Sequence, residues 1–239
     1  MKPADVRAER LQAALRSMPM FRGLPPRELA HLEAIATLRD YRRGETMWSA
    51  GDAPEFFTLI VRGRVKIVGH GPGGDVILEI FDVGEPVGAI AVYDRRPYPA
   101  SAIALEPVSM IRIPATEYFD LLDRHPEFTR AVMRELTRLS LALTRKLGEM
   151  RGQRVDTRIA RLFLALAERM GRTAGTAVEI PLALTRQEIA ELVGTTVESA
   201  IRVMSRWGRE GLVVTEESGF RIPSIARLGT LVAEPDGEP

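Results

Sequence analysis

The chain has 239 residues, of which 45% are hydrophobic and 27% charged, and its net charge is +1. This composition is typical of a globular protein with two modest domains, and any surface for nucleic acid must come from local clustering of charge. The sequence contains no cysteine, which excludes disulfides, cysteine-ligated zinc, cysteine-ligated iron–sulfur clusters and thiol redox sensing.

Signals for a metal site or a membrane segment are lacking in the sequence. The three histidines, His31, His70 and His125, show no metal-ligand spacing. No apolar run approaches the ~18 residues that a membrane span needs, and Met1–Arg16 lacks the apolar region of a signal peptide. We therefore expect a cytoplasmic protein with no metal site.

The first half of the chain predicts a β-rich domain with flanking helices. Apolar residues recur at helical spacing over Ala4–Ser17 and Pro26–Ala36, and a third short helix is expected over Ala115–Leu122. Between Tyr41 and Pro114, short β-rich runs alternate with glycines, which predicts a small sandwich or barrel, with or without a ligand. The predicted strands are Thr46–Trp48, Phe56–Val61, Val65–Val68, Val76–Phe81 and Met110–Ile113.

A long helix is predicted over Glu127–Gly152. Apolar residues at alternating steps of four and three give an a/d pattern over about three heptads, and Lys146 takes the one remaining seam position. Leu141 and Leu147 add a second apolar flank, so we expect one face to pack on its own domain and the other on a second copy. The seam residues are Val132, Leu136, Leu139, Leu143 and Met150.

The last third of the chain predicts a winged helix-turn-helix. A hinge at Arg151–Val155 precedes a helix over Thr157–Met170 that Asp156 can cap, a polar loop at Gly171–Val178 and a strand at Glu179–Leu184. Thr185 then caps a helix and Glu188 completes a capping box, Gly194 allows a sharp turn and Thr196 caps a second helix. A predicted hairpin follows: Leu212–Thr215, a turn at Glu216–Gly219, and Phe220–Ile222.

The second of these helices is the expected recognition helix for double-stranded DNA. Arg202 can donate two hydrogen bonds to guanine and Glu198 can accept one from cytosine, while Val197 or Ile201 could touch a thymine methyl group. Arg206 and Arg209 suit phosphates. The full predicted DNA-binding set is Thr185, Arg186, Thr195, Thr196, Val197, Glu198, Ile201, Arg202, Arg206 and Arg209.

Four stretches resemble the CRP/FNR family of bacterial regulators: Arg43-Gly44-Glu45 with Ala50-Gly51-Asp52, Val61–Lys66, Leu184–Gly194, and Val197-Glu198 with Arg202. The resemblance implies an α+β fold with a cyclic-nucleotide-binding-like β-roll at residues 1–125, a dimerisation helix and hinge at 126–153, and a winged helix-turn-helix at 154–239. It further implies a homodimeric transcription regulator that reads pseudo-palindromic TTGAT-like sites. Activator is the expected role, with repressor left open. RNA polymerase is the implied partner, near the Gly171–Val178 loop.

The chain departs from cyclic-AMP-binding members of that family. Ala89 stands where a glutamate is expected, Pro99-Ala100 where an arginine and a serine are expected, and Leu143-Thr144 where a polar pair contacts the base. A phosphate buried without a cationic partner is unfavourable, so we expect an effector other than cyclic AMP. The branch of the family that senses nitric oxide through haem is similar in this respect. A haem-based nitric oxide sensor with His31 or His70 as axial ligand, a sensor of another small apolar ligand, or a domain with no ligand remain open. The expected effector-pocket residues, between the β-roll and the long helix, are Gly88, Ala89, Ile90, Tyr98, Ala100, Ser101, Leu139, Leu143 and Thr144.

Two other classes of function compete with a DNA-binding regulator. The β-roll could be a ligand-binding module that signals through the C-terminal domain to a protein partner. An enzyme is not expected, because the sequence has no Gly-rich phosphate loop, no recognisable Ser/His/Asp arrangement and no metal cluster.

Overall fold

A computed structural model describes residues 3–71, 74–149 and 154–233 of the chain. The chain forms two compact units, residues 1–142 and 143–239. The division falls inside the long helix α5 (Pro126–Glu149). The predicted end of that helix at Gly152 and most of the predicted hinge lie outside the described residues.

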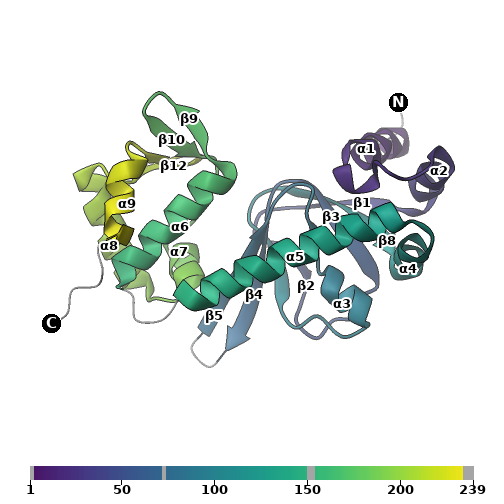
Figure 1. Ribbon diagram of the computed structural model, residues 1–239, viewed down its shortest axis with the longest axis horizontal. Coiled ribbons are helices and arrows are strands. Elements are labelled where there is room, and N and C mark those ends of the chain that lie inside the picture. Colours follow the sequence, from purple (N-terminus) through teal and green to yellow (C-terminus); the bar gives the residue numbers. More distant parts are fainter. Residues whose placement is uncertain (1–2, 72–73, 150–153, 234–239) are drawn as a thin grey trace. The chain divides into compact units, whose positions relative to one another are not determined.

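The first unit is a roll of two four-stranded antiparallel sheets (Figure 1). One sheet has the order β1 (Thr37–Tyr41), β8 (Val108–Pro114), β3 (Phe56–Arg62) and β6 (Pro86–Val87). The other has the order β2 (Thr46–Trp48), β7 (Ser101–Ala104), β4 (Val65–Gly71) and β5 (Gly74–Phe81). All five predicted strands are confirmed, within a few residues at their ends. The sequence patterns missed β1, β6 and β7.

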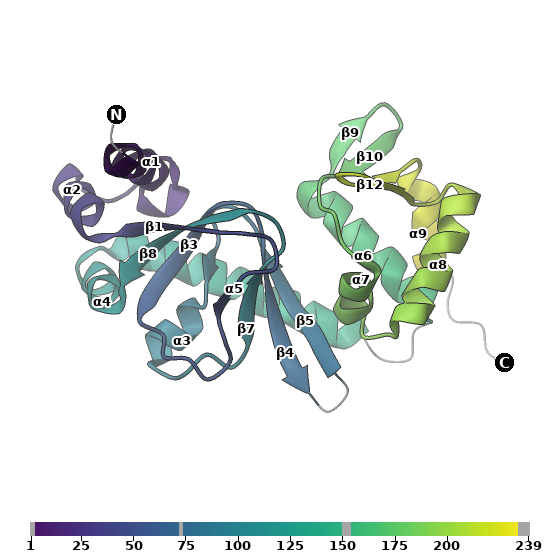
Figure 2. The ribbon, with the colours of Figure 1, turned by 180° about the vertical axis from the view of Figure 1, so that it is seen from behind.

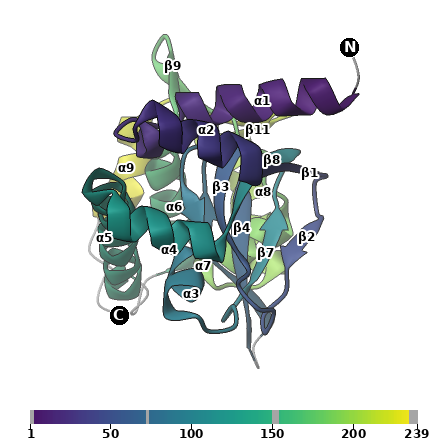
Figure 3. The same ribbon diagram turned by 90° about the vertical axis from the view of Figure 1, so that its right-hand side faces the viewer.

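Helices flank this roll. The helices α1 (Pro3–Ser17) and α2 (Pro26–Ile35), joined by a 3-10 turn at Pro19–Phe21, lie beside β1 and β8 (Figure 3). The short helix α3 (Ala89–Asp94) and α4 (Ala115–Arg124) complete the unit before α5. Phe128 and Val132 of α5 are buried in the same apolar cluster as Phe57 and Tyr118, so the start of α5 belongs to the core of the roll.

The second unit packs helices on a small antiparallel sheet (Figure 2). Its elements are α6 (Val155–Met170), β9 (Arg172–Ala174), β10 (Ala177–Ile180), α7 (Arg186–Val193), α8 (Val197–Glu210), β11 (Val214–Glu216), β12 (Gly219–Ile222) and α9 (Ile225–Ala233). The sheet has the order β11-β12-β10-β9. The rings of Phe163 on α6 and Phe220 on β12 pack edge to face with their centroids 4.9 Å apart, a contact between α6 and the sheet.

Three expectations for this unit were wrong. The region expected to be a loop, Gly171–Val178, contains most of the β9–β10 hairpin, whose turn has Gly175 at φ 65°. The strand expected at Glu179–Leu184 begins earlier and ends at Ile180. Asp156 is not the cap of α6, because the helix begins one residue before it and Arg154 occupies the N-cap position.

No helix in the described part of the chain is both long enough and apolar enough to cross a membrane.

Candidate nucleic-acid interface and ligand pocket

Local capping sets the start of each helix of the helix-turn-helix. The Thr185 hydroxyl accepts a hydrogen bond from the Glu188 backbone N–H at 3.1 Å, and the Glu188 carboxylate accepts one from the Thr185 N–H at 2.8 Å. The predicted capping box is therefore confirmed. Gly194 ends α7 in the left-handed region, at φ 66°, and the Thr196 hydroxyl caps α8 by accepting from the Ser199 N–H at 3.3 Å.

Helix α8 has one buried and one exposed face. The side chains Ala200, Val203, Met204 and Trp207 are buried, and Trp207 is only 1% exposed. This burial fixes the rotation of α8 about its axis, so the opposite face of the helix is turned toward solvent. The exposed residues of α8 that were predicted to bind DNA are Glu198, Ile201, Arg202, Arg206 and Arg209.

Glu198 and Arg202 lie one turn apart on that face, and no ion pair joins them. Arg202 donates to the Ser199 hydroxyl at 3.3 Å. Within the residues that the structure describes, no carboxylate pairs with Arg202 and no hydrogen bond engages the Glu198 side chain. Both charged ends are therefore available to an external partner. Ile201 is 46% exposed beside them.

Other residues of the predicted DNA-binding set already have partners in the second unit. Arg206 approaches Asp156 on α6 at 3.4 Å, and Arg209 donates to the Ser205 carbonyl oxygen at 3.4 Å. Arg186 donates to the Thr215 hydroxyl on β11 at 2.8 Å, which connects α7 to the wing, and burial lowers its pKa. Val197 and Thr195 are partly buried, whereas the capping residues Thr185 and Thr196 are exposed.

The residues predicted to form the effector pocket are mostly enclosed by their own neighbours. Ala89 and Ala100 are each 4% exposed and Ser101 is 6% exposed, whereas Ile90 is 56% exposed. Gly88 precedes α3 at φ 72°. Leu139 packs against the core of the roll and Thr144 is exposed, while the Leu143 side chain lies outside the described residues.

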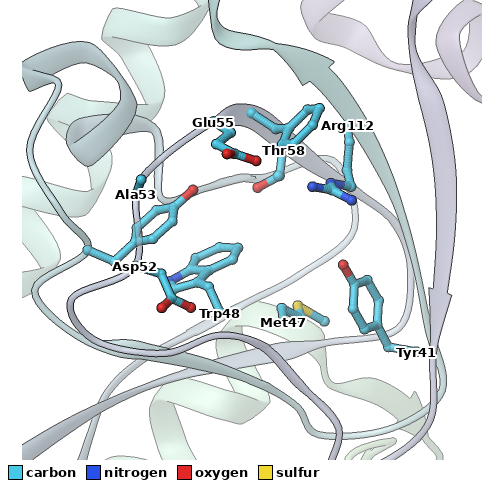
Figure 4. A pocket seen from close by; sticks show the side chains of 10 residues that line it. Tyr41, Met47, Trp48, Asp52, Ala53, Glu55, Thr58 and Arg112 are labelled. Atoms are coloured by element: carbon cyan, nitrogen blue, oxygen red, sulfur yellow. The ribbon is translucent and has the colours of Figure 1, made fainter.

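A cavity of about 320 Å³ lies elsewhere in the roll, and of the predicted residues only Tyr98 lines it (Figure 4). Local sequence patterns could not reveal it, because its walls come from segments that are distant in the chain and meet only through strand pairing and the packing of the two sheets. Its lining residues are Tyr41, Met47, Trp48, Asp52, Ala53, Glu55, Phe56, Thr58, Tyr98 and Arg112.

The predicted dimer seam lies partly in the core of its own unit. Val132 is 2% exposed, and Leu136 and Leu139 pack as partly buried residues against the two apolar clusters of the roll. Val132 therefore has no surface left for a second copy, contrary to its predicted role. Met150 and the Leu143 side chain lie outside the described residues.

The histidines considered as haem ligands are engaged by other side chains. His31 contacts Glu117 at 2.9 Å, and the two ring nitrogens of His70 contact Asp75 at 2.7 Å and Ser101 at 3.0 Å. Neither histidine lines the cavity. Neither histidine is therefore presented to the cavity as an axial haem ligand, and the described residues contain no cluster of three or more His, Cys, Asp or Glu side chains that could hold a metal ion.

A Ser/His/Asp chain does exist, which corrects the expectation from the sequence. It runs from Ser101 through His70 to Asp75. The Ser101 hydroxyl is not presented to a substrate, because the residue is 6% exposed and its oxygen also accepts a hydrogen bond from the Ala50 N–H at 3.0 Å. These hydrogen bonds among Ser101, His70 and Asp75 instead join the end of the β4–β5 hairpin to β7, and Ser101 extends them to the loop after β2.

The fold and these elements define a class of protein: a β-roll followed by a winged helix-turn-helix. Residues 38–125 match the cyclic nucleotide-binding domain family and residues 157–231 match the Crp-like helix-turn-helix domain family, together more than half of the chain. The chain belongs to the CRP/FNR family of transcription regulators, and its second domain is a DNA-binding helix-turn-helix.

Relatives cover parts of the chain. The CRP-like cAMP-activated global transcriptional regulator of Mycobacterium tuberculosis is 26% identical over 120 residues, which is 50% of this chain and 54% of the relative. Lysophospholipase nte1 of Aspergillus niger is 28% identical over 144 residues, which is 56% of this chain but 9% of that enzyme. The matches thus span about half the length of the bacterial relative and less than a tenth of the lysophospholipase, too little to carry its activity to this chain.

Solved structures match over more of the chain. A Ruegeria pomeroyi protein with a proposed cyclic-nucleotide-binding role is 26% identical, with a TM-score of 0.59 over 95% of this chain and 99% of that one. FixK2 of Bradyrhizobium japonicum is 17% identical, with a TM-score of 0.72 over 84% of this chain and 99% of that one. The likeness to FixK2 is one of fold alone.

Proposed function

We propose that the chain acts as a homodimeric, sequence-specific transcription regulator whose helix α8 reads TTGAT-like half-sites. The exposed face of α8 is the observation that carries this proposal, because Glu198 and Arg202 lie there one turn apart without a carboxylate–guanidinium pairing between them. An acceptor and a bidentate donor in that arrangement suit cytosine N4 and guanine O6/N7 in the major groove. Val197-Glu198 and Arg202 also carry the resemblance to regulators with such sites.

Selection from a random duplex library tests the proposal directly. The full chain should enrich a pseudo-palindrome with half-sites one helical turn apart, about 34–36 Å. Enrichment of no sequence would contradict it and favour the second candidate, a ligand-binding module that signals to a protein partner.

Arg202→Ala should weaken binding to the selected site by about 5- to 150-fold, since a bidentate base contact contributes about 1–3 kcal/mol. It should also relax discrimination at one guanine. Arg209→Ala is the matched control, because Arg209 lies further along α8 and should affect all sequences about equally. If discrimination survives Arg202→Ala unchanged, the recognition assignment is wrong.

Dimerisation is supported by the exposed face of α5 rather than by Val132. Met133 and Leu141 are 55% and 53% exposed, and with exposed Thr137 they follow a spacing of four residues along the helix. Large apolar side chains on an exposed helix face suit a second copy of the same helix. Sedimentation equilibrium should give twice the mass of the chain, and a monomer at micromolar concentration would contradict this part of the proposal.

An effector other than cyclic AMP is supported by the segment that follows β6, which contains α3. The positions where cyclic-AMP-binding members are expected to have a glutamate and an arginine–serine pair hold Ala89 and Pro99-Ala100, none of which is charged. Of the neighbouring arginines, Arg96 is paired with Asp94 at 3.0 Å and its side chain is 79% exposed, so it faces solvent rather than the roll. Calorimetric titration with cyclic AMP should therefore show no binding. RNA polymerase is the proposed partner for activation, near the β9–β10 hairpin.

A further inference from the structure

The cavity of the β-roll has a buried floor and a charged rim. Tyr41, Trp48, Thr58 and Tyr98 form the floor, each with an exposed fraction below a tenth. The Trp48 and Tyr98 rings stack with their centroids 4.3 Å apart, which makes the floor a rigid aromatic surface. A volume of about 320 Å³ suits a small metabolite, since it lies at the low end for small-molecule sites.

Arg112 supplies the cationic wall of this cavity. Its guanidinium carbon lies 3.8 Å from the centre of the Phe56 ring, so the ring covers one face of the guanidinium group and leaves its N–H edge open. Among the residues described, none forms a hydrogen bond or an ion pair with Arg112. Figure 4 shows its guanidinium end pointing into the cavity. A planar fork of N–H donors in this position suits a carboxylate.

Two phenol groups supply neutral donors on the floor. Burial raises the pKa of Tyr98 to about 12 and also raises the pKa of Tyr41. The positive charge of Arg112 lowers both pKa values, but less than burial raises them. Both hydroxyls therefore remain protonated near neutral pH and can donate to an anionic group. Figure 4 places the Tyr41 hydroxyl and the Arg112 guanidinium on the same side of the cavity.

The rim carries charge of the opposite sign. Asp52 and Glu55 are exposed there, and Asp52 accepts a hydrogen bond from the Ser49 N–H at 2.8 Å. No side-chain hydrogen bond or ion pair of Glu55 is found in the described ranges of the chain. One cation and two carboxylates line the cavity, so a simple anion would meet net repulsion at its entrance, whereas a ligand with a second, positive end would not.

We propose that this cavity binds a small zwitterion of the amino-acid type with an apolar side chain. Its carboxylate pairs with Arg112, its ammonium group with Glu55 at the rim, and its side chain packs on Trp48. Of the predicted effector-pocket residues the site includes only Tyr98, and ligand binding there does not require that the chain read any DNA sequence.

Calorimetric titration of the full chain without DNA tests the proposal. The probes are L-leucine and L-phenylalanine as zwitterions, 4-methylpentanoate, which lacks the ammonium group of leucine, and 3-methylbutylamine, which lacks its carboxylate. At least one zwitterion should bind, and L-leucine should bind at least about tenfold tighter than the amine, because the buried end of the site recognises the carboxylate. If neither zwitterion binds with a dissociation constant below about 10 mM, the proposal is overturned. If 4-methylpentanoate binds as tightly as L-leucine, the zwitterion assignment is wrong.

Variants locate the site. Arg112→Gln should weaken binding of the zwitterion by about tenfold or more. Glu55→Gln should weaken it by about two- to fivefold and leave 4-methylpentanoate binding no weaker, since Glu55 is exposed. Arg96→Gln is the matched control on the same domain, and it should bind like the unmodified chain. Undiminished binding by Glu55→Gln and Arg112→Gln would overturn the proposal. Should Arg112→Gln fail to fold, as judged by circular dichroism, Tyr41→Phe takes its place as the variant at the carboxylate end.

Discussion

Gly219 begins β12, and a methyl group at this position would collide with the backbone of the neighbouring strand. The added Cβ atom would overlap the carbonyl oxygen of Ile180 and lie 2.9 Å from the Leu182 nitrogen. These are backbone atoms, so no flexible side chain can move aside. The pairing of β10 with β12, in which Ile180 lies opposite Phe220, must shift to admit the methyl group.

The expected loss of stability for Gly219→Ala is about 2–4 kcal/mol. Overpacking by one carbon typically destabilises by about 1–3 kcal/mol, and a sheet hydrogen bond left unmade beside the buried Phe220 adds about 1 kcal/mol or more. Gly208→Ala is the matched control, for which we expect a gain of stability instead of a loss. Gly208 lies within α8 with open space around its Cβ position, so alanine should stabilise by about 0.5–1 kcal/mol through helix propensity.

Denaturant unfolding measures both changes in a Trp48→Phe background. Trp207, buried in the second unit, is then the only tryptophan and reports the unfolding of that unit. The free energy of unfolding should fall for Gly219→Ala and rise for Gly208→Ala. If the free energy of unfolding of Gly219→Ala lies within about 0.5 kcal/mol of that of the parent, the steric reasoning is refuted.

Two further changes test local interactions. Thr185→Ala removes one half of the capping box and should lower the free energy of unfolding of the second unit by about 1 kcal/mol, whereas Thr185→Ser should be nearly neutral; equal losses for both variants would contradict the capping role. Hydrogen bonds from Arg10 and then Ser109 hold the pKa of Asp40 below its ordinary value of 3.8. The stability that this carboxylate gives is therefore present above pH 3.8 and is lost as the pH falls through the lower folded pKa. Arg10→Gln should raise the pKa of Asp40 toward 3.8 in an NMR titration, and an unchanged value would contradict the assignment.

Elements with local signals were predictable from the sequence. The capping box of Thr185 and Glu188, the turn at Gly194 and the cap at Thr196 each depend on residues within a few positions, and the structure confirms all of them. The prediction for α6 went wrong at its start because a helix can begin without a side-chain cap, and a capping residue type at Asp156 does not show that it caps.

Strands whose stability depends on neighbours were harder to predict. The strand β9 consists of exposed residues with little apolar character, and it is held in place by pairing with β10. The strand β7 pairs with β2 and β4, which lie far from it in the sequence. Because pairing partners come from distant segments, no local pattern indicates them.

The sequence by itself determined the helix-turn-helix, because helix caps, a glycine turn and an apolar stripe act over short distances along one segment. Only the tertiary structure decided which charged groups remain available, since Arg206 is held by Asp156 on another helix whereas Glu198 and Arg202 on α8 remain without an ion-pair partner in the described chain. It likewise decided the cavity lined by Tyr41 and Arg112, residues about seventy positions apart that the pairing of β1 with β8 brings to the same side of the cavity. Burial and charge pairing are properties of the packed chain, and they become defined only when distant segments meet.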